Sequence, residues 1–308
     1  MLTAKDVSKF FGDICAVNKV NISLNKGEIF GLIGPDGAGK TTLMRILCGI
    51  IKADEGEINL LDYPISQIER LRHEVGYMPQ RFSLYGDLTV MENINFFGSL
   101  YGLDYRTINK RVDEILEVTG ILPFKKRLAG KLSGGMKQKL ALTCALITRP
   151  KILILDEPTY GVDPQSRREF WRILYNLCGE GMTIMISTPY MEEAELCTRV
   201  GFMSSGSIKL VDYPYRLKEN FPYQVIEIII REKKLINNLR QLSSIYDLSI
   251  RGGKYRLIVS DYEKAEAELK EWLSKIGMAD YFFKKVKPTM EDIFVMLIER
   301  EARNGLGY

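Results

Sequence analysis

The sequence has little histidine, no paired cysteines and no long apolar run. Histidine occurs once, at position 73. The five cysteines are scattered without C-x-x-C spacing, which argues against a disulfide framework and against a zinc site. No stretch approaches the roughly 18 apolar residues of a membrane-spanning helix, and the first residues lack the apolar run of a signal peptide. We therefore expect a protein of the reducing cytosol that meets a membrane only through partner chains.

The charge balance is nearly even, which restricts what the surface can bind. The chain has 43 basic and 39 acidic side chains and a formal net charge of +4. This surplus is too small to indicate a nucleic-acid-binding face, so nucleic acid is not expected as a partner. With 308 residues, of which 46% are hydrophobic, the chain is long enough for one large domain and one smaller domain.

Hydrophobic periodicity indicates both strands and helices in the larger domain. Residues 2–33 alternate apolar and polar positions between turn residues, as strands do. Two short apolar runs, at 152–155 and 183–186, are typical of buried parallel strands. At about 84–147, apolar residues recur at spacings of three and four, which indicates helices. We therefore expect an α/β domain over residues 1–218, with a parallel-sheet core and a helical insert.

Residues 219–308 follow a different pattern. They predict a strand, a helix at 233–241, two strands, a helix at 262–276, and a final strand and helix. This order is typical of a small α+β sandwich, of which the ferredoxin-like arrangement is one form. We expect a separate C-terminal accessory domain.

The strongest functional motif is Gly34-Pro-Asp-Gly-Ala-Gly-Lys-Thr41, which has the form G-x-x-x-x-G-K-T. It lies after a predicted strand and before a predicted helix, the context in which such a loop binds phosphates. Glycines let the backbone wrap around phosphates, Lys40 can reach the β- and γ-phosphates, and the Thr41 hydroxyl can ligate Mg²⁺. The nucleotide-binding residues expected here are Gly34, Asp36, Gly37, Ala38, Gly39, Lys40, Thr41 and Thr42.

A second candidate group is the acid pair Asp156-Glu157, directly after the apolar run 152–155. Ligands of an α/β sheet collect at the carboxyl ends of its strands. Asp156 can hold Mg²⁺ through water, and Glu157 can polarise the attacking water in phosphoryl transfer. An acid pair that only caps a helix is the alternative, but the phosphate loop favours a nucleoside triphosphatase that uses ATP and Mg²⁺.

The segment Leu132-Ser-Gly-Gly-Met136 separates this chain from other phosphate-loop proteins. It resembles the signature of the ABC ATPase family, and the resemblance covers residues 1 to about 218 with motifs in the family's order. The resemblance implies an ABC cassette with an antiparallel β subdomain beside the parallel sheet. It also implies that Ser133, Gly134 and Gly135 bind the γ-phosphate held by an opposite subunit, so that the site works only as a dimer.

Further motifs resemble those of the same family. Gln80, which ends Gly76-Tyr-Met-Pro-Gln80, resembles the loop glutamine that senses Mg²⁺ and the helical insert, which implies a catalytic and metal-sensing role. Asp163 resembles the acidic residue of the loop after the acid pair. Phe11 resembles the aromatic residue that stacks on adenine. Phe10 in that role, or a core position for Phe11, is the alternative.

Pro189 departs from the family pattern. Residues 182–195 otherwise follow it, but the family usually carries a histidine at this position. Proline has no imidazole nitrogen and no backbone N–H, so it cannot link the γ-phosphate to the catalytic glutamate. The only histidine, His73, is distant in sequence and is expected at the surface or at a helix entry. Pro189 therefore predicts a slow site in a chain that pairs with a different cassette. A slow homodimer that relies on Glu157 and an ATP-locked scaffold are the alternatives.

Two further resemblances indicate an exporter. The blocks GPDGAGKTTLMR, LYGDLTVMEN and GVDPQSRREFW are similar to the first cassette of tandem-cassette ATPases that serve ABC-2 type multidrug exporters. The tail Lys287-Pro-Thr-Met-Glu-Asp-Ile-Phe294 resembles the ending of many single ABC-2 type cassettes. These resemblances imply a subunit at the cytoplasmic face of the membrane, held there by ABC-2 type transmembrane permease subunits.

The resemblance also implies that the permease contacts the cleft between Gln80 and residues 84–97. An apolar cluster in this region is either insert core or interface. The cluster consists of Ile94, Phe96, Phe97 and Leu100. The tail helix likewise has an apolar face that packs either within the chain or against another subunit. This face consists of Ile293, Phe294, Leu297 and Ile298.

Overall fold

The structure is a computed structural model that divides into two compact units, Met1–Asp212 and Tyr213–Tyr308. The division falls earlier than the predicted boundary at residue 218, because the short helix α8 (Pro214–Glu219) packs on the last helix of the second unit. No side chain is described at residue 251 or at 298–305. The residues left undescribed altogether are 82–83, 230–238, 240–241, 252, 278–280 and 306–308.

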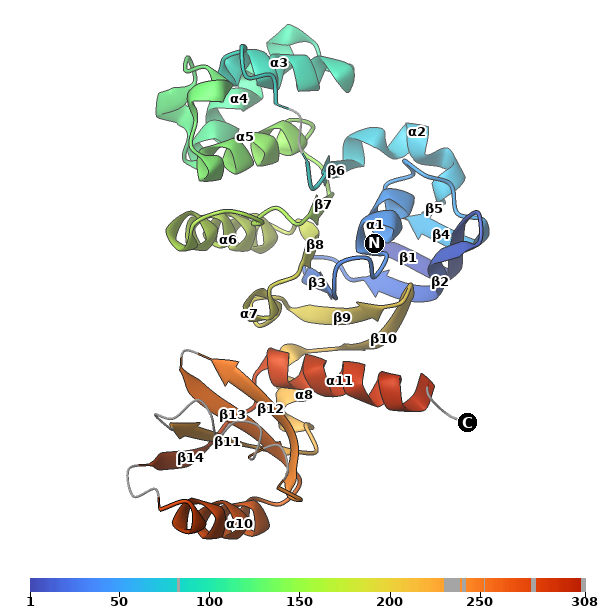
Figure 1. Cartoon of the computed structure of the whole chain (residues 1–308). Coiled ribbons are helices and arrows are strands. Elements are labelled where there is room, and N and C mark those ends of the chain that lie inside the picture. Colours follow the sequence, from blue (N-terminus) through green and yellow to red (C-terminus); the bar gives the residue numbers. More distant parts are fainter. Residues whose placement is uncertain (82–83, 230–238, 240–241, 252, 278–280, 306–308) are drawn as a thin grey trace. The chain divides into compact units, whose positions relative to one another are not determined.

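The first unit is built on a six-stranded sheet (Figure 1). Its strands are β3 (Ile29–Ile33), β6 (Val75–Met78), β7 (Ile152–Asp156), β8 (Thr183–Thr188), β9 (Arg199–Ser204) and β10 (Ser207–Asp212). They take the order β10-β9-β3-β8-β7-β6, and every neighbouring pair except β10-β9 is parallel. All residues of β3, β7 and β8 are buried, which explains why these segments read as unbroken apolar runs.

A second, antiparallel sheet of four strands completes the α/β core, as the cassette resemblance implies. Its strands are β1 (Leu2–Phe11), β2 (Ile14–Leu24), β4 (Glu55–Leu60) and β5 (Tyr63–Pro64). One hydrophobic core joins this sheet to the parallel sheet and to α1 (Lys40–Leu47), and it includes Leu24, Phe30 and Leu43. Helix α1 ends before Gly49, whose φ of +68° a helix cannot continue.

A group of packed helices forms the predicted insert. These are α3 (Val90–Leu100), α4 (Tyr105–Thr119) and α5 (Gly134–Leu146). Each begins at a side-chain cap, and Thr89 and Glu92 form a reciprocal capping box at α3. The apolar cluster divides between core and surface, because Ile94 is buried whereas Phe96 and Leu100 are exposed.

Two segments of the insert are joined by backbone hydrogen bonds, and we call residues 86–91 and 125–130 the clasp. Gly130 N–H donates to Gly86 O at 2.9 Å, Ala129 N–H to Leu88 O at 2.8 Å, and Val90 N–H to Arg127 O at 2.9 Å. A Cβ at Gly130 would lie 3.0 Å from Gly86 O, so glycine permits this close approach. The clasp ties the segment that leads into α3 to the segment that leads into α5.

Three helices complete the first unit: α2 (Ile68–Leu71), α6 (Pro164–Gly179) and α7 (Met191–Ala194). Helix α6 begins at Asp163, whose carboxylate accepts the amides of Gln165 and Ser166, and Pro164 occupies its first turn. Across the described residues of both units, no helix has the length and apolar character needed to cross a membrane.

The second unit contains a four-stranded antiparallel sheet with the order β12-β13-β11-β14. Its strands are β11 (Gln224–Ile229), β12 (Ile245–Arg251), β13 (Lys254–Val259) and β14 (Phe282–Val286). This order, with the helix α10 (Tyr262–Lys275) between β13 and β14, is the ferredoxin-like arrangement. The helix predicted at 233–241 lies outside the described residues, apart from Leu239.

The tail motif packs inside the second unit at the start of α11 (Met290–Gly305). The Asp292 carboxylate is buried, accepts the Thr289 amide at 2.7 Å, and forms an ion pair with Arg256 of β13 at 2.7 Å. Met290 and Ile293 are also buried. Of the predicted apolar face, Phe294 and Leu297 are half-buried, and the Ile298 side chain lies outside the description. The spacing of proline, acids and apolar residues in this motif therefore docks a helix within the chain.

Candidate active site

The phosphate loop connects the end of β3 to the start of α1, and its shape requires glycine. A Cβ at Gly34 would lie 2.1 Å from Met203 O. Gly39 has a φ of +100°, and a Cβ there would lie 2.2 Å from Ala16 O. Both positions therefore exclude side chains. Gly37 has a φ of +78° with open space around it, so its requirement is conformational.

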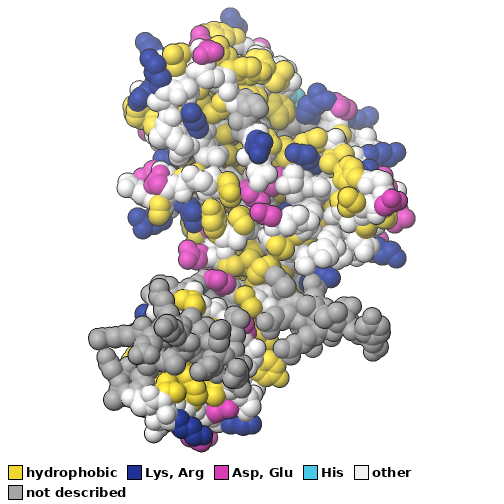
Figure 2. Space-filling view, viewed as in Figure 1, with side chains coloured by type: hydrophobic (Ala, Val, Ile, Leu, Met, Phe, Trp, Pro, Cys, Tyr) yellow, Lys and Arg dark blue, Asp and Glu magenta, His cyan; other side chains and the backbone are white. Residues whose placement is uncertain are grey.

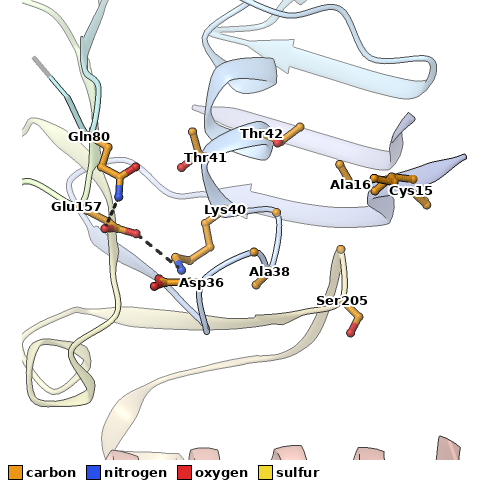
Figure 3. A pocket seen from close by; sticks show the side chains of 14 residues that line it. Cys15, Ala16, Asp36, Ala38, Lys40, Thr41, Thr42, Gln80, Glu157 and Ser205 are labelled. Carbon is orange, nitrogen blue, oxygen red and sulfur yellow. Dashed lines mark hydrogen bonds and ion pairs between the residues drawn. The ribbon is translucent and has the colours of Figure 1, made fainter. Parts of the chain in front are cut away.

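The loop borders a cavity of about 450 Å³ (Figure 3). Most predicted nucleotide residues line it, together with both predicted catalytic residues; these are Asp36, Gly37, Ala38, Gly39, Lys40, Thr41, Thr42, Gln80 and Glu157. Gly34 lies beneath the loop, where its carbonyl accepts a hydrogen bond from Lys40. Gln80 and Glu157 lie at one end of the cavity, and Cys15 and Ala16 of β2 lie at the other (Figure 3).

Sequence reasoning does not identify the lining residues Ile14, Cys15, Ala16, Ser205 and Gly206. They come from β2 and from the turn between β9 and β10. Backbone hydrogen bonds hold that turn in place: Gly206 N–H donates to Ala38 O at 3.0 Å, and Asn18 N–H donates to Gly206 O at 2.8 Å. Because backbone atoms make these contacts, the side-chain types carry no signal.

Lys40 is buried at the base of the cavity. Its Nζ donates to Gly34 O at 2.8 Å and to Pro35 O at 2.9 Å, and it lies 3.9 Å from Glu157 Oε1. Burial lowers the Lys40 pKa, and the carboxylates of Glu157 and Asp36 oppose that shift. The ammonium group is thus held by carbonyl oxygens at the position where the loop would enclose phosphates.

Glu157 is held in a strained position after β7. Its φ of +49° lies in the left-handed region that glutamate rarely adopts. Its amide donates to Ser187 Oγ at 2.9 Å and to Ser187 O at 3.2 Å, which fixes this conformation. Gln80 Nε2 donates to Glu157 Oε2 at 2.8 Å (Figure 3). Burial raises the Glu157 pKa, although Gln80 and Lys40 favour the ionised form.

Asp156 ends β7 and is fully buried. Ser187 Oγ donates to its Oδ1 at 2.6 Å, whereas its Oδ2 has no hydrogen-bond partner in the described part of the chain. A buried carboxylate oxygen without a partner is costly unless a ligand, water or cation satisfies it. Asp156 and the Thr41 hydroxyl are both hard oxygen donors, so this set fits a hydrated divalent cation.

The predicted γ-phosphate residues Ser133, Gly134 and Gly135 begin α5 and are not part of the described cavity lining. Ser133 caps the helix, with Oγ accepting the Met136 amide at 3.3 Å, and Ser133 and Gly134 are exposed. Phe11 also lies outside the lining. It is 49% exposed and pairs across the sheet with the lining residue Ile14.

The structure shows the remaining predicted residues in different settings. Asp163 caps α6. Pro189 directly follows β8, and the next amide, that of Tyr190, donates to Thr188 Oγ1 at 3.1 Å. His73 is exposed on a short 3₁₀ turn of residues 72–74, away from the cavity lining.

Comparisons with known sequences identify the family. The ABC transporter family pattern matches residues 17–160. YbhF of Escherichia coli (strain K12), a probable multidrug ABC transporter ATP-binding protein, is 41% identical over 92% of this chain, which spans only 49% of the YbhF length. The linearmycin resistance ATP-binding protein LnrL of Bacillus subtilis (strain 168) is 33% identical over 99% of this chain and 100% of its own length. The Nod factor export ATP-binding protein I of Bradyrhizobium diazoefficiens is 38% identical over 96% of this chain and 95% of its own.

Solved structures agree with this assignment. An ATP-binding subunit of an ABC transporter has a TM-score of 0.64 at 26% identity and covers 72% of this chain and 93% of its own. A dimeric bacterial ABC transporter cassette, MJ0796, has a TM-score of 0.63 at 26% identity. The match covers 69% of this chain and 98% of MJ0796. The same cassette is known in a post-hydrolysis state bound to ADP and Pi. That structure has 25% identity and a TM-score of 0.63, and the match covers 69% of this chain and 98% of the cassette. With the phosphate loop, buried lysine and acid pair at one cavity, the chain is an ATP-binding ATPase and belongs to the ABC transporter ATP-binding proteins.

Proposed function

We propose that this chain is the ATP-hydrolysing subunit of an ABC-2 type exporter. It works as one of two cassettes that hold nucleotide between them. Transmembrane permease subunits hold it at the cytoplasmic face of the membrane. Relatives whose names refer to multidrug transport, linearmycin resistance and Nod factor export support the exporter role. The YbhF match, which spans 49% of that protein, supports a likeness to one cassette of a tandem pair.

The separation of the two sets of phosphate-binding groups carries the proposal of a dimer. Lys40 and Glu157 line the cavity, whereas Ser133 and Gly134 are exposed at the start of α5 and contribute nothing to that lining. The start of a helix offers unpaired N–H groups that favour an anion. A second cassette, presenting its own α5 to this cavity, supplies the missing anion-binding groups.

The residues of this chain divide the chemistry of hydrolysis. The loop glycines and Lys40 bind and orient the phosphates, and Glu157 polarises the attacking water. Asp156, Thr41 and Gln80 would hold Mg²⁺, which neutralises phosphate charge when it is bound. The hydrogen bond from Gln80 to Glu157 connects the base to the loop that precedes the helical insert.

Pro189 supports pairing with a different cassette. It offers no donor to a γ-phosphate, so the site of this chain is the slower one, while its α5 completes a faster site on the partner. An ATP-locked scaffold is the second candidate, and Pro189 is the observation that favours it. The buried Glu157, held by Gln80 and Lys40, favours hydrolysis, because a scaffold does not require a water-activating carboxylate.

The proposed permease contact is the exposed apolar face of Tyr85, Phe96 and Leu100, of which Phe96 and Leu100 belong to α3. Tyr85 and Phe96 pack edge to face, with ring centroids 4.7 Å apart. Leu100 also lines a cavity of about 320 Å³ with Phe97 and neighbouring residues. Hydrophobic side chains are exposed over the insert (Figure 2). Tyr85 of this face lies five residues after Gln80 in the sequence, which places the proposed contact close to Gln80 along the chain.

A Leu100→Asp variant tests the permease contact. A comparison of phosphate release by the chain alone and by the complex tests the paired cassette. Leu100 is 61% exposed, so the substitution should leave the fold intact while placing a charge in an apolar contact. We expect the purified chain to release phosphate slowly, the complex with co-purified permease and second cassette to release it faster, and Leu100→Asp to bind ATP but fail to join the complex.

The matched control is Tyr63→Asp, which alters an apolar residue of β5 that is 48% exposed and lies outside the insert. It should leave complex assembly unchanged. Turnover of the chain alone at the rate of the complex would exclude the paired-cassette proposal. Assembly of Leu100→Asp at the normal level would exclude this permease contact.

A further inference from the structure

A buried carboxylate, Glu193 of α7, connects the segments that leave β7 and β8. Its side chain is only 2% exposed. Thr159 Oγ1 donates to Glu193 Oε2 at 3.0 Å. Arg167 of α6 forms an ion pair with the other oxygen, at 3.6 Å between Nε and Oε1. Among the described residues, neither Arg167 Nε nor Glu193 Oε1 makes a hydrogen bond.

The positions of these residues relate the network to the reacting groups. Thr159 lies two residues after Glu157, and Glu193 lies four residues after Pro189. The Arg167 guanidinium also stacks on the Tyr190 ring at 4.1 Å from its centroid. The network therefore joins the loop after the catalytic base to the segment that contains Pro189, with α6 as its rigid support.

Stability alone does not explain this arrangement. Burying a carboxylate costs free energy that an ion pair recovers only with good geometry and further hydrogen bonds. This ion pair is long, and its two facing atoms lack hydrogen bonds. Packed apolar side chains of similar volume would hold α6 and α7 together at least as well. What the charges add is a defined position for Tyr190 and, through it, for Pro189.

We propose that Glu193 and Arg167 are positioning residues for ATP hydrolysis, which keep the segment 188–190 in register with the loop after Glu157. Pro189 provides no donor to the phosphate, so we expect this residue to act only through its position. The network sets that position by holding Thr159 and Tyr190 at once. The inference rests on ATP hydrolysis by this chain and not on the identity of its permease.

Glu193→Gln in the full-length chain tests this role. The amide keeps the size of the side chain and an acceptor for Thr159, but it loses the charge that orients Arg167. We expect amide hydrogen exchange at residues 188–193 to accelerate, and kcat to fall about fivefold to thirtyfold. The KM for ATP should stay within about twofold, because the nucleotide-binding residues are untouched. Arg167→Met, at a partly exposed position, should reproduce the effect, and Arg167→Lys should restore part of it.

The matched control is Glu28→Gln, which disrupts another buried ion pair of the same unit, between Glu28 and Arg199 at 3.1 Å. This pair lies at the opposite ends of the strands, before β3. Glu28→Gln should lower the melting temperature without changing exchange at 188–193 or kcat. Equal effects of the two Gln variants, unchanged exchange in Glu193→Gln, or faster exchange with normal kcat would each overturn the proposal. The exchange measurement is independent of transport and of partner chains.

Discussion

Glu157 combines two conditions that a glutamate normally avoids, a left-handed backbone and burial. Such strain persists only where surrounding contacts determine it, and here both amide hydrogen bonds to Ser187 do so. Burial raises the pKa of the carboxyl, which makes it a better base once it is ionised. The local cost in free energy therefore falls on the residue that we propose as the catalytic base.

At the residue scale, Glu157→Gln should lower turnover about a hundredfold to ten-thousandfold while ATP affinity is retained. In the unaltered protein, turnover should fall as the pH decreases, starting above the range of an ordinary glutamate, because the raised pKa lets the base take up its proton sooner. The same raised pKa means that the ionised side chain destabilises the fold at neutral pH, and that stability increases as the pH falls through this pKa. Glu157→Gln should thus raise the melting temperature at neutral pH.

Phosphate release between pH 5 and 9 and thermal unfolding measure these effects. Glu180→Gln, at an exposed glutamate that ends α6, is the control and should behave like the unaltered protein. If the acid limb of the pH profile kept its midpoint in Glu157→Gln, another group would be the base.

Lys40 and Asp156 are predictable from the sequence. Lys40 belongs to a contiguous motif, and Asp156 directly follows an apolar run that predicts a buried strand. Ser187 is harder to predict, since a serine at the end of a buried strand has no distinctive pattern. Its role as acceptor for Glu157 N–H and donor to Asp156 follows only from the pairing of β7 with β8. Cys15 and Ser205 line the cavity from two different sheets, because Cys15 belongs to β2 and Ser205 follows β9. The spacing of residues in the sequence does not predict that they meet there.

At the scale of elements, the start of α5 is packed tightly against α6. A Cβ added at Gly135 would lie 2.5 Å from Ser166 Oγ, whereas one added at Gly134 would meet nothing within 4 Å. Of these two neighbouring glycines, only Gly135 is thus required for close packing of the helices. The helices themselves are predictable from apolar spacing and caps, but this asymmetry depends on the neighbouring helix and is absent from the sequence pattern.

Gly135→Ala should therefore destabilise the first unit by about 1–3 kcal/mol, since the added methyl group forces α5 away from α6. Gly134→Ala, the matched control, should change stability little or increase it slightly, because alanine favours helix more than glycine does. Urea unfolding of both variants measures the difference. Ser166→Gly should rescue Gly135→Ala, and equal destabilisation by the two glycine substitutions would contradict this packing argument.

At the scale of the whole molecule, each of the two units has a hydrophobic core among its described residues. One is formed by the two sheets and α1, and the other by the sheet of the second unit with α10. In the second unit, a buried ion pair between Arg256 and Asp292 connects α11 to β13. The existence of the second unit is predictable from the change in hydrophobic periodicity. Its first residue is not, because it depends on the packing of α8 against α11, and the sequence pattern does not indicate that contact.

Asp292→Ala should destabilise the second unit by about 3–5 kcal/mol, because it removes the closer carboxylate of the buried Arg256, at 2.7 Å, and leaves only that of Glu227, at 4.0 Å. ATP affinity should remain unchanged, since all described nucleotide-cavity residues belong to the first unit. Limited proteolysis should cut the variant within 213–308 sooner than the unaltered protein. Lys275→Ala, which removes an exposed ion pair with Glu271, is the control. A parallel loss of ATP affinity would contradict the prediction that the nucleotide cavity depends on the first unit alone.

The clasp has a mechanical consequence for a paired transporter. Segments 86–91 and 125–130 share backbone hydrogen bonds, which side-chain substitutions do not remove, so we expect the two segments to move together. One end of the clasp leads to the proposed permease face, and the other leads to Ser133, which in the proposed dimer touches the nucleotide of the opposite cassette. In the proposed dimer, a movement of the permease against one subunit would therefore reach the nucleotide bound by the opposite subunit.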